Sequence, residues 1–142
     1  MLCTKILVAY DSSDLAKKSL EKAIEIANMN SFIQIHVLHV MATIPAREVI
    51  TSKLYQKMHD ELSQRGQEIL SEAQSALASL PNKCQCVQME GAPARVILDY
   101  IQENNCDLII MGSRGLSGFK EFLGSVSHTV IQQSKVPILL VK

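Results

Sequence analysis

The sequence has no excess of charge of either sign and no long apolar run. Its 14 basic and 14 acidic residues cancel, and neither kind is gathered into a stripe. Proteins that bind nucleic acids usually carry a concentrated positive field. No stretch approaches the roughly 20 apolar residues of a membrane span. We therefore expect a chain that binds neither nucleic acid nor membrane.

Cysteine pairs at zinc-ligand or redox spacing are also absent. Cys3, Cys84, Cys86 and Cys106 include no CxxC pair and no second ligand cluster. Such thiols usually act as small hydrophobes, with a redox role for the CxC pair as the alternative. The N-terminal segment lacks the charged region and cleavage site of a secretory signal. The resulting expectation is a cytoplasmic protein.

Catalytic constellations are missing as well. The chain has no nucleophile elbow, and no paired carboxylates have a convincing geometry. His36 and His39 are three residues apart on a predicted strand, so they face opposite sides and cannot share a metal ion. Ser125 and His128 share a helical turn but lack a third partner. We predict no catalytic residue and no metal ligand from the protein, and we interpret His39 as a hydrogen-bonded core or rim histidine.

Apolar segments instead predict five strands. Residues 5–10, 32–40, 107–112 and 136–141 are rich in Ile, Val and Leu. Three of these four are nearly continuous apolar runs, which is typical of parallel strands covered on both faces. Residues 84–90 alternate more and less polar side chains, which predicts an edge strand.

Helical patterns fill the intervals between these strands. The longest repeats apolar positions that include Leu54, Met58 and Leu62. Gly66 lies inside it and should weaken it by about 1 kcal/mol relative to Ala. The four predicted helices cover residues 14–29, residues 47–80, a segment opened by Pro93, and a segment from Gly124 or Ser125 to before Pro137.

The length of 142 residues predicts a single domain over residues 1–142, in which strands and helices alternate strictly. Its expected architecture is an open parallel sheet with helices on both faces and right-handed crossovers. Such sheets bind ligands at the carboxyl ends of their strands, where the strand order reverses. The segments expected at that edge are residues 9–13, 39–42, 90–93 and Met111 onward.

Two stretches at that edge carry candidate ligand groups. In residues 8–14, Asp11 can accept a hydrogen bond from adenine or ribose, bind a metal, or cap the following helix. Residues 112–115 (GSRG) offer glycines and Arg114, and residues 124–127 (GSVS) begin a helix whose N-terminus suits a phosphate. No GKS or GKT follows, so this is not a Walker A loop. These residues support a phosphate cradle and a glycine-rich turn equally.

Taken together, the segments resemble the universal stress protein family along essentially the whole chain. KILVAYDSSDLAKKSLEKA resembles its opening strand and helix, CDLIIMGSRGLSGFKEFLGSVSHTVI its signature, and PILLVK its closing strand. The resemblance implies an α/β, Rossmann-like fold related to the adenine nucleotide α-hydrolases, with five parallel strands in the order 3-2-1-4-5. It also implies a site for ATP, or for AMP or ADP, with Mg²⁺ on the phosphates.

The family motif G-x2-G-x9-G-S/T also implies which residues surround the nucleotide. Asp11 would lie at the base edge, and Val40 would pack on adenine. Backbone N–H groups and hydroxyls near the last helix would surround the phosphates. The implied set is Ala9, Tyr10, Asp11, Val40, Met111, Gly112, Arg114, Gly115, Gly124, Ser125, Val126 and Ser127.

Two positions depart from the family pattern. Eight residues, 116–123, separate Gly115 from Gly124, where the motif has nine. We expect the last helix to hold Gly124 and Ser125 at the end of the fourth strand, with the shortening absorbed within residues 119–123. Ser12 stands where the family often has glycine, and serine is tolerable there if its φ is negative.

The function implied by the resemblance is an ATP-binding, homodimeric module of the stress response with slow or no ATP hydrolysis. The family pairs its last strand across the dimer, so Pro137–Val141 is the expected interface, and an exposed apolar edge would otherwise favour aggregation. One alternative is a dimeric interaction scaffold without nucleotide binding, which the shortened loop favours. A weaker alternative is an ATP-cleaving enzyme, for which a pyrophosphate loop and a substrate domain are lacking.

Overall fold

The computed structural model describes residues 3–45, 51–114 and 124–142. Strands and helices alternate along these segments, and in the part described none of the helices is long and apolar enough to cross a membrane. The strands are β1 (Lys5–Ala9), β2 (Gln34–Met41), β3 (Cys84–Glu90), β4 (Leu108–Gly112) and β5 (Ile138–Val141). The helices are α1 (Asp14–Ala27), α2 (Ser52–Leu77), α3 (Pro93–Asn104) and α4 (Ser125–Gln133).

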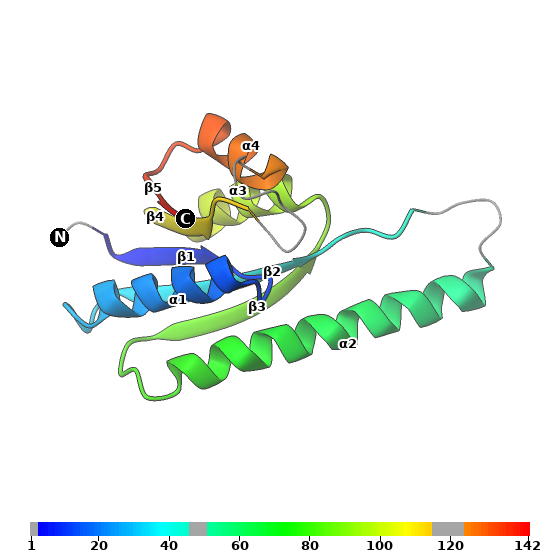
Figure 1. Cartoon of the computed structure of the whole chain (residues 1–142), viewed down its shortest axis with the longest axis horizontal. Coiled ribbons are helices and arrows are strands. Elements are labelled where there is room, and N and C mark those ends of the chain that lie inside the picture. Colours follow the sequence, from blue (N-terminus) through cyan, green and yellow to red (C-terminus); the bar gives the residue numbers. More distant parts are fainter. Residues whose placement is uncertain (1–2, 46–50, 115–123) are drawn as a thin grey trace.

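The five strands form one parallel sheet in the order β3-β2-β1-β4-β5, which confirms the expected topology. Helices α1 and α2 cover one face, and α3 and α4 cover the other (Figure 1). The strand order reverses between β1 and β4, which are neighbours in the sheet although almost 100 residues separate Ala9 from Leu108. A ligand is therefore expected where these two strands end.

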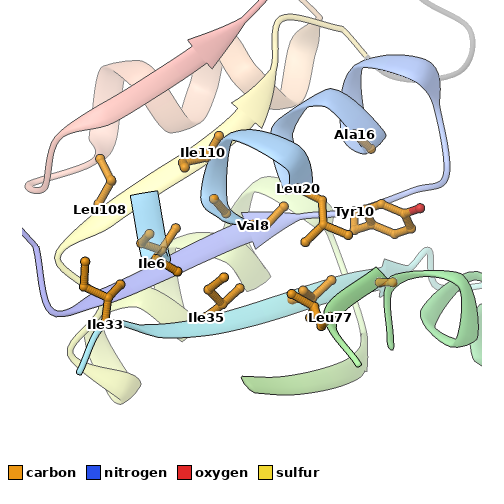
Figure 2. Close-up of a cluster of buried hydrophobic side chains, with 14 of the residues drawn as sticks. Ile6, Val8, Tyr10, Ala16, Leu20, Ile33, Ile35, Leu77, Leu108 and Ile110 are labelled. Carbon is orange, nitrogen blue, oxygen red and sulfur yellow. The ribbon is translucent and has the colours of Figure 1, made fainter. Parts of the chain in front are cut away.

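One hydrophobic cluster lies on each face of the sheet. On the side of α1 and α2, Ile6, Val8 and Ile35 are fully buried (Figure 2). On the opposite side, Leu7 and Ile109 are equally buried beneath α3 and α4. Each such side chain contributes about 1.5–3 kcal/mol on burial. Because the central strands contribute side chains to both clusters, their sequences are apolar at nearly every position.

The two edge strands differ from the central ones in burial. β3 has no fully buried residue, as its mixed polarity predicted. β5 is the opposite edge and is also only partly covered, with 39% of Leu139 exposed. The apolar strand β5 is thus the part of the sheet with the strongest physical reason to be covered by another chain.

Helix α2 is packed on the sheet along only part of its length. It begins after Thr51, whose hydroxyl accepts a hydrogen bond from Leu54 N–H (3.2 Å). Its C-terminal half buries Leu70 and Ala73, whereas its N-terminal half extends past the carboxyl ends of the strands (Figure 1). Leu54 and Leu62 are consequently 47% and 38% exposed. The apolar stripe predicted over residues 47–80 is therefore buried only where strands lie beneath it.

The four cysteines are free thiols. Cys3 and Cys106 are buried, and Cys84 and Cys86 are half-buried. Burial raises the pKa of the Cys86 and Cys106 thiols to about 11, so both remain protonated near neutral pH. The structure agrees with their interpretation as small hydrophobic side chains.

Candidate functional site

The first wall of the candidate site is the turn that follows β1. Strands β1 and β2 pair as far as Ala9 and Leu38, and Tyr10 N–H adds one more bond to the Leu38 carbonyl (2.9 Å). The chain then leaves the sheet, and the Asp11 carboxylate accepts a hydrogen bond from Ser13 N–H (3.0 Å). Within the described segments, the second carboxylate oxygen has no partner. Asp11 thus retains an acceptor for a ligand at this edge.

Tyr10 fixes this turn from inside the protein. Its side chain is 4% exposed and belongs to the cluster beneath α1 and α2 (Figure 2). Its hydroxyl donates to the Glu72 carboxylate of α2 (3.4 Å). Burial, reinforced by Glu72, raises the pKa of Tyr10 to about 12, so the phenol stays neutral. The Tyr10 side chain is therefore not available to a ligand.

Ser12 lies in the middle of the turn with φ at 62°. This is the left-handed region, so the condition of a negative φ, under which serine would be tolerated in place of glycine, is not met. The conformation costs a residue with a Cβ about 1–2 kcal/mol, and glycine avoids that cost. The turn imposes it because the chain must pass from β1 into α1 within four residues, 10–13. Ser13 then caps α1 by accepting a hydrogen bond from Ala16 N–H (3.2 Å).

The second wall joins the end of β4 to the start of α4. The Ser113 carbonyl accepts hydrogen bonds from Gly124 N–H (2.7 Å) and from the Ser127 hydroxyl (2.8 Å). Ser113 N–H in turn donates to the Val141 carbonyl of β5 (2.8 Å). The last helix therefore starts at the end of the fourth strand, as expected despite the shortened spacing. Gly115 and residues 119–123, where the shortening was placed, lie outside the described residues.

Neither glycine of this wall has free room for a side chain. A Cβ on Gly112 would lie 2.7 Å from Leu15 Cβ, so glycine allows α1 to approach the end of β4 closely. A Cβ on Gly124 would lie 3.3 Å from Arg114 Cα and 3.5 Å from the Ser113 carbonyl oxygen. The backbones of β4 and α4 therefore approach each other closely, and a larger residue would begin to fill the space between them.

The N-terminus of α4 has no side-chain cap. Ser13 and Thr51 cap α1 and α2 with their hydroxyls, but the N-cap of α4 is Gly124. The backbone N–H groups of residues 125–127 therefore receive no cap from a side chain in the part of the chain that the structure describes, and they carry the partial positive charge of the helix. Donors arranged in this way suit a phosphate.

The two serines of α4 have different roles. The Ser127 side chain is 2% exposed, and its hydroxyl is already bonded to the Ser113 carbonyl. It holds Ser113 against the start of α4 and is not free to donate to a ligand, whereas Ser125 is exposed. Sequence reasoning did not single out Ser113, because its backbone carbonyl makes the contact and no side-chain pattern marks it.

The remaining predicted residues lie around the same edge. Ala9 and Val40 are half-buried at the ends of β1 and β2 and pack against the cluster under α3 and α4. Met111 is 4% exposed within β4. Arg114 is half-buried beside Gly124 and forms no ion pair with a described residue. The fold thus brings the described members of the predicted set to the carboxyl ends of β1, β2 and β4.

Comparison with known proteins places this arrangement in a family. The model of the universal stress protein family (Usp) matches residues 3–142. The universal stress protein YxiE of Bacillus subtilis is 35% identical over 146 aligned positions, which cover 97% of this chain and 98% of that protein.

Solved structures show the same fold. That of MJ0577, a universal stress protein of Methanocaldococcus jannaschii, superimposes with a TM-score of 0.88 at 26% identity and covers 100% of this chain and 97% of that one. A family protein of Arabidopsis thaliana, solved with AMP bound, gives a TM-score of 0.73 at 23% identity over 98% of this chain and 91% of that one. The sheet order, the family match and these likenesses agree: the chain belongs to the universal stress protein family.

Proposed function

We propose that this protein binds ATP at the carboxyl ends of β1, β2 and β4 and acts as a homodimeric regulatory module in the stress response. The observation that carries the proposal is the junction of β4 and α4. There, an uncapped helix N-terminus is anchored to the strand end through Gly124 and Ser113. The Arabidopsis relative with bound AMP has the same fold and supports an adenine nucleotide as the ligand class.

Each wall would hold a different part of the nucleotide. The unpartnered oxygen of Asp11 would accept a hydrogen bond from the base edge, and Val40 would pack against adenine. The N–H groups at the start of α4 and the exposed Ser125 hydroxyl would bind phosphate oxygens. Arg114, which lacks a carboxylate partner in the described segments, would add positive charge.

Mg²⁺ would be bound mainly by the phosphates. Among residues 3–45, 51–114 and 124–142, no group of three or more His, Cys, Asp or Glu side chains is placed to hold a metal ion. An oxygen-rich ligand such as triphosphate is the kind of partner that Mg²⁺ prefers. The described residues at the phosphate end, 112–114 and 124–127, include no His, Asp or Glu. Slow or absent hydrolysis is part of the proposal.

The proposed dimer forms through Pro137–Val141. β5 is an edge strand whose Leu139 is exposed and whose Ile138 and Leu140 are only partly covered. Antiparallel pairing of two such strands would satisfy their backbone groups and cover these side chains. A mass of one chain in light scattering at micromolar concentration would contradict this part of the proposal.

The substitution Gly124→Val tests the nucleotide site. Its side chain would enter the space between α4 and Arg114, which a single Cβ already approaches to 3.3 Å. We expect the affinity for ATP with Mg²⁺, measured by titration calorimetry, to fall at least about tenfold, a loss of about 1.4 kcal/mol. The dimer should persist, because β5 is unchanged.

Thr129→Val is the matched control for that substitution. It introduces the same side chain into α4, one turn beyond its N-terminus, where Thr129 bonds only the Ser125 carbonyl (3.0 Å). Its ATP affinity should equal that of the wild type. Wild-type affinity in Gly124→Val would refute the cradle, and a wild type that binds no adenine nucleotide would favour the interaction-scaffold function.

A further inference from the structure

A hydrogen bond between a side chain and the backbone closes the pairing of β1 and β2 at the candidate site. His39 Nδ1 lies 2.9 Å from the Tyr10 carbonyl oxygen. A carbonyl can only accept, so Nδ1 carries the proton and donates. The two backbones pair only as far as Ala9 and Leu38. The imidazole therefore bonds a carbonyl that lies just beyond the last paired residues of the two strands, immediately before Asp11.

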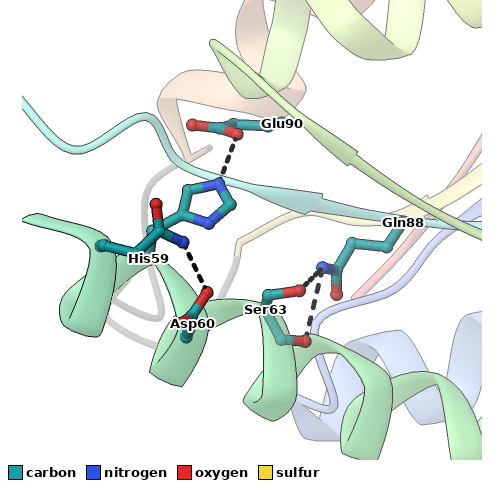
Figure 3. A network of polar contacts seen from close by, with 6 residues as sticks. His59, Asp60, Ser63, Gln88 and Glu90 are labelled. Atoms are coloured by element: carbon teal, nitrogen blue, oxygen red, sulfur yellow. Dashed lines mark hydrogen bonds and ion pairs between the residues drawn. The ribbon is translucent and has the colours of Figure 1, made fainter.

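The His39 ring is fixed by its surroundings. A Cβ on Gly66 would lie 3.1 Å from His39 Cδ2, so the absence of a side chain in α2 makes room for the ring. The register of β2 and β3 places Gln88 beside His39 on the same face. The Gln88 amide donates toward Ser63 of α2, with 3.4 Å to its carbonyl and to its hydroxyl (Figure 3). The ring thus fills a slot between the turn after β1 and α2.

This bond acts on the residue that would recognise the base. On its C-terminal side, Asp11 is held by the bond between its own carboxylate and Ser13 N–H. On its N-terminal side, the preceding carbonyl, that of Tyr10, is fixed by its hydrogen bond with His39. Between Asp11 and Ser13, Ser12 adopts a costly positive φ. A strained turn persists only when several contacts with its surroundings fix its conformation. His39 supplies one of the constraints on this turn from outside it.

We propose that His39 is a positioning residue that sets the selectivity of the site for adenine. This proposal rests on the nucleotide-binding function proposed above. Adenine presents an amino N–H at its 6-position, which the Asp11 carboxylate can accept, whereas guanine presents a carbonyl oxygen there. A fixed carboxylate therefore favours adenine, and a mobile one discriminates less. The phosphate end lies on β4 and α4, so the bond should not affect it.

The test compares His39→Leu with His39→Asn. The two side chains have nearly the same size, but only Asn can place an N–H donor where Nδ1 stands. Affinities for ATP, GTP and inorganic tripolyphosphate are measured by titration calorimetry, and folding by thermal unfolding. We expect His39→Leu to bind ATP about fivefold to tenfold more weakly than the wild type, which is the effect of one hydrogen bond. Its affinity for tripolyphosphate should be unchanged. His39→Asn should retain most of the preference for ATP over GTP.

The outcomes are distinct. If the ratio of the ATP affinity to the GTP affinity is unchanged in His39→Leu, the proposal is overturned. An equal loss of affinity for ATP, GTP and tripolyphosphate also overturns it, because it would indicate a general distortion of the site. Equal losses in the Asn and Leu variants also overturn it, because donation would then not matter. If His39→Leu does not fold, His39→Phe retains the ring volume without the donor and takes its place. A wild type that binds no ATP contradicts the proposed function itself and this proposal with it.

Discussion

Ser12 shows how the site constrains a single residue. Its φ of 62° follows from the path of the chain between β1 and α1 and from the Asp11–Ser13 bond that spans it. No hydrogen bond from its hydroxyl to a described residue offsets the cost of that conformation. Serine at this position therefore lowers stability without a visible gain in packing.

Replacing Ser12 with glycine should stabilise the protein. Glycine removes a backbone cost of about 1–2 kcal/mol and loses part of that gain through its greater freedom in the unfolded chain. We expect a net gain of about 1 kcal/mol in the free energy of unfolding, measured by urea denaturation. Ser71→Gly, the same change at an exposed position inside α2, should instead lower it by about 0.5 kcal/mol. A loss of stability in Ser12→Gly would contradict this account of the turn.

At the scale of elements, β2 links the sheet to both helical layers. His39 faces α2, and His36, three residues earlier, points to the opposite side, as the strand period predicted. His36 is 5% exposed, and its Nδ1 lies 2.7 Å from the Tyr100 hydroxyl of α3. Burial, with Lys5 and Lys83 nearby, lowers the pKa of His36. The imidazole that bonds Tyr100 is therefore favoured in its neutral form.

This buried histidine should make stability depend on pH. In the unfolded chain a histidine binds a proton near pH 6.5, whereas folded His36 resists protonation. Unfolding therefore takes up a proton below about pH 6.5, and the free energy of unfolding falls as the pH drops through that range. We expect His36→Leu to show a shallower decline between pH 7 and pH 5 in urea titrations.

His128 provides the control for that measurement. It is exposed on α4, so His128→Gln should retain the pH dependence of the wild type. If the free energies of unfolding of His36→Leu and of the wild type decline in parallel as the pH falls, groups other than the His36–Tyr100 pair govern stability in acid.

At the scale of the whole molecule, the sheet and its strand order were predictable. Strands buried on both faces are apolar throughout, and strict alternation with helices permits few topologies. The extent of the buried part of α2 was not predictable. Leu54 and Leu62 continue its apolar stripe beyond the last strand beneath it, and only the length of the sheet decides which positions are covered.

The candidate site was predictable in its location and less so in its contacts. Glycines and hydroxyls marked the ends of β1 and β4, and the family resemblance implied which of them would surround a nucleotide. The roles of Ser113 and Tyr10 depend on backbone carbonyls, which no side-chain pattern reveals. The φ of Ser12 depends on where β1 leaves the sheet, which is set by tertiary packing.

Equilibrium dialysis of the wild-type protein against ATP and Mg²⁺ tests the central claim most directly. The chain has three tyrosines and no tryptophan, so bound adenine is readily measured against the weak absorbance of the protein. The proposed site predicts saturable binding that approaches one ATP per chain and that is at least about tenfold weaker in Gly124→Val. An absence of saturable binding at millimolar ATP would contradict a nucleotide site at the ends of β1 and β4.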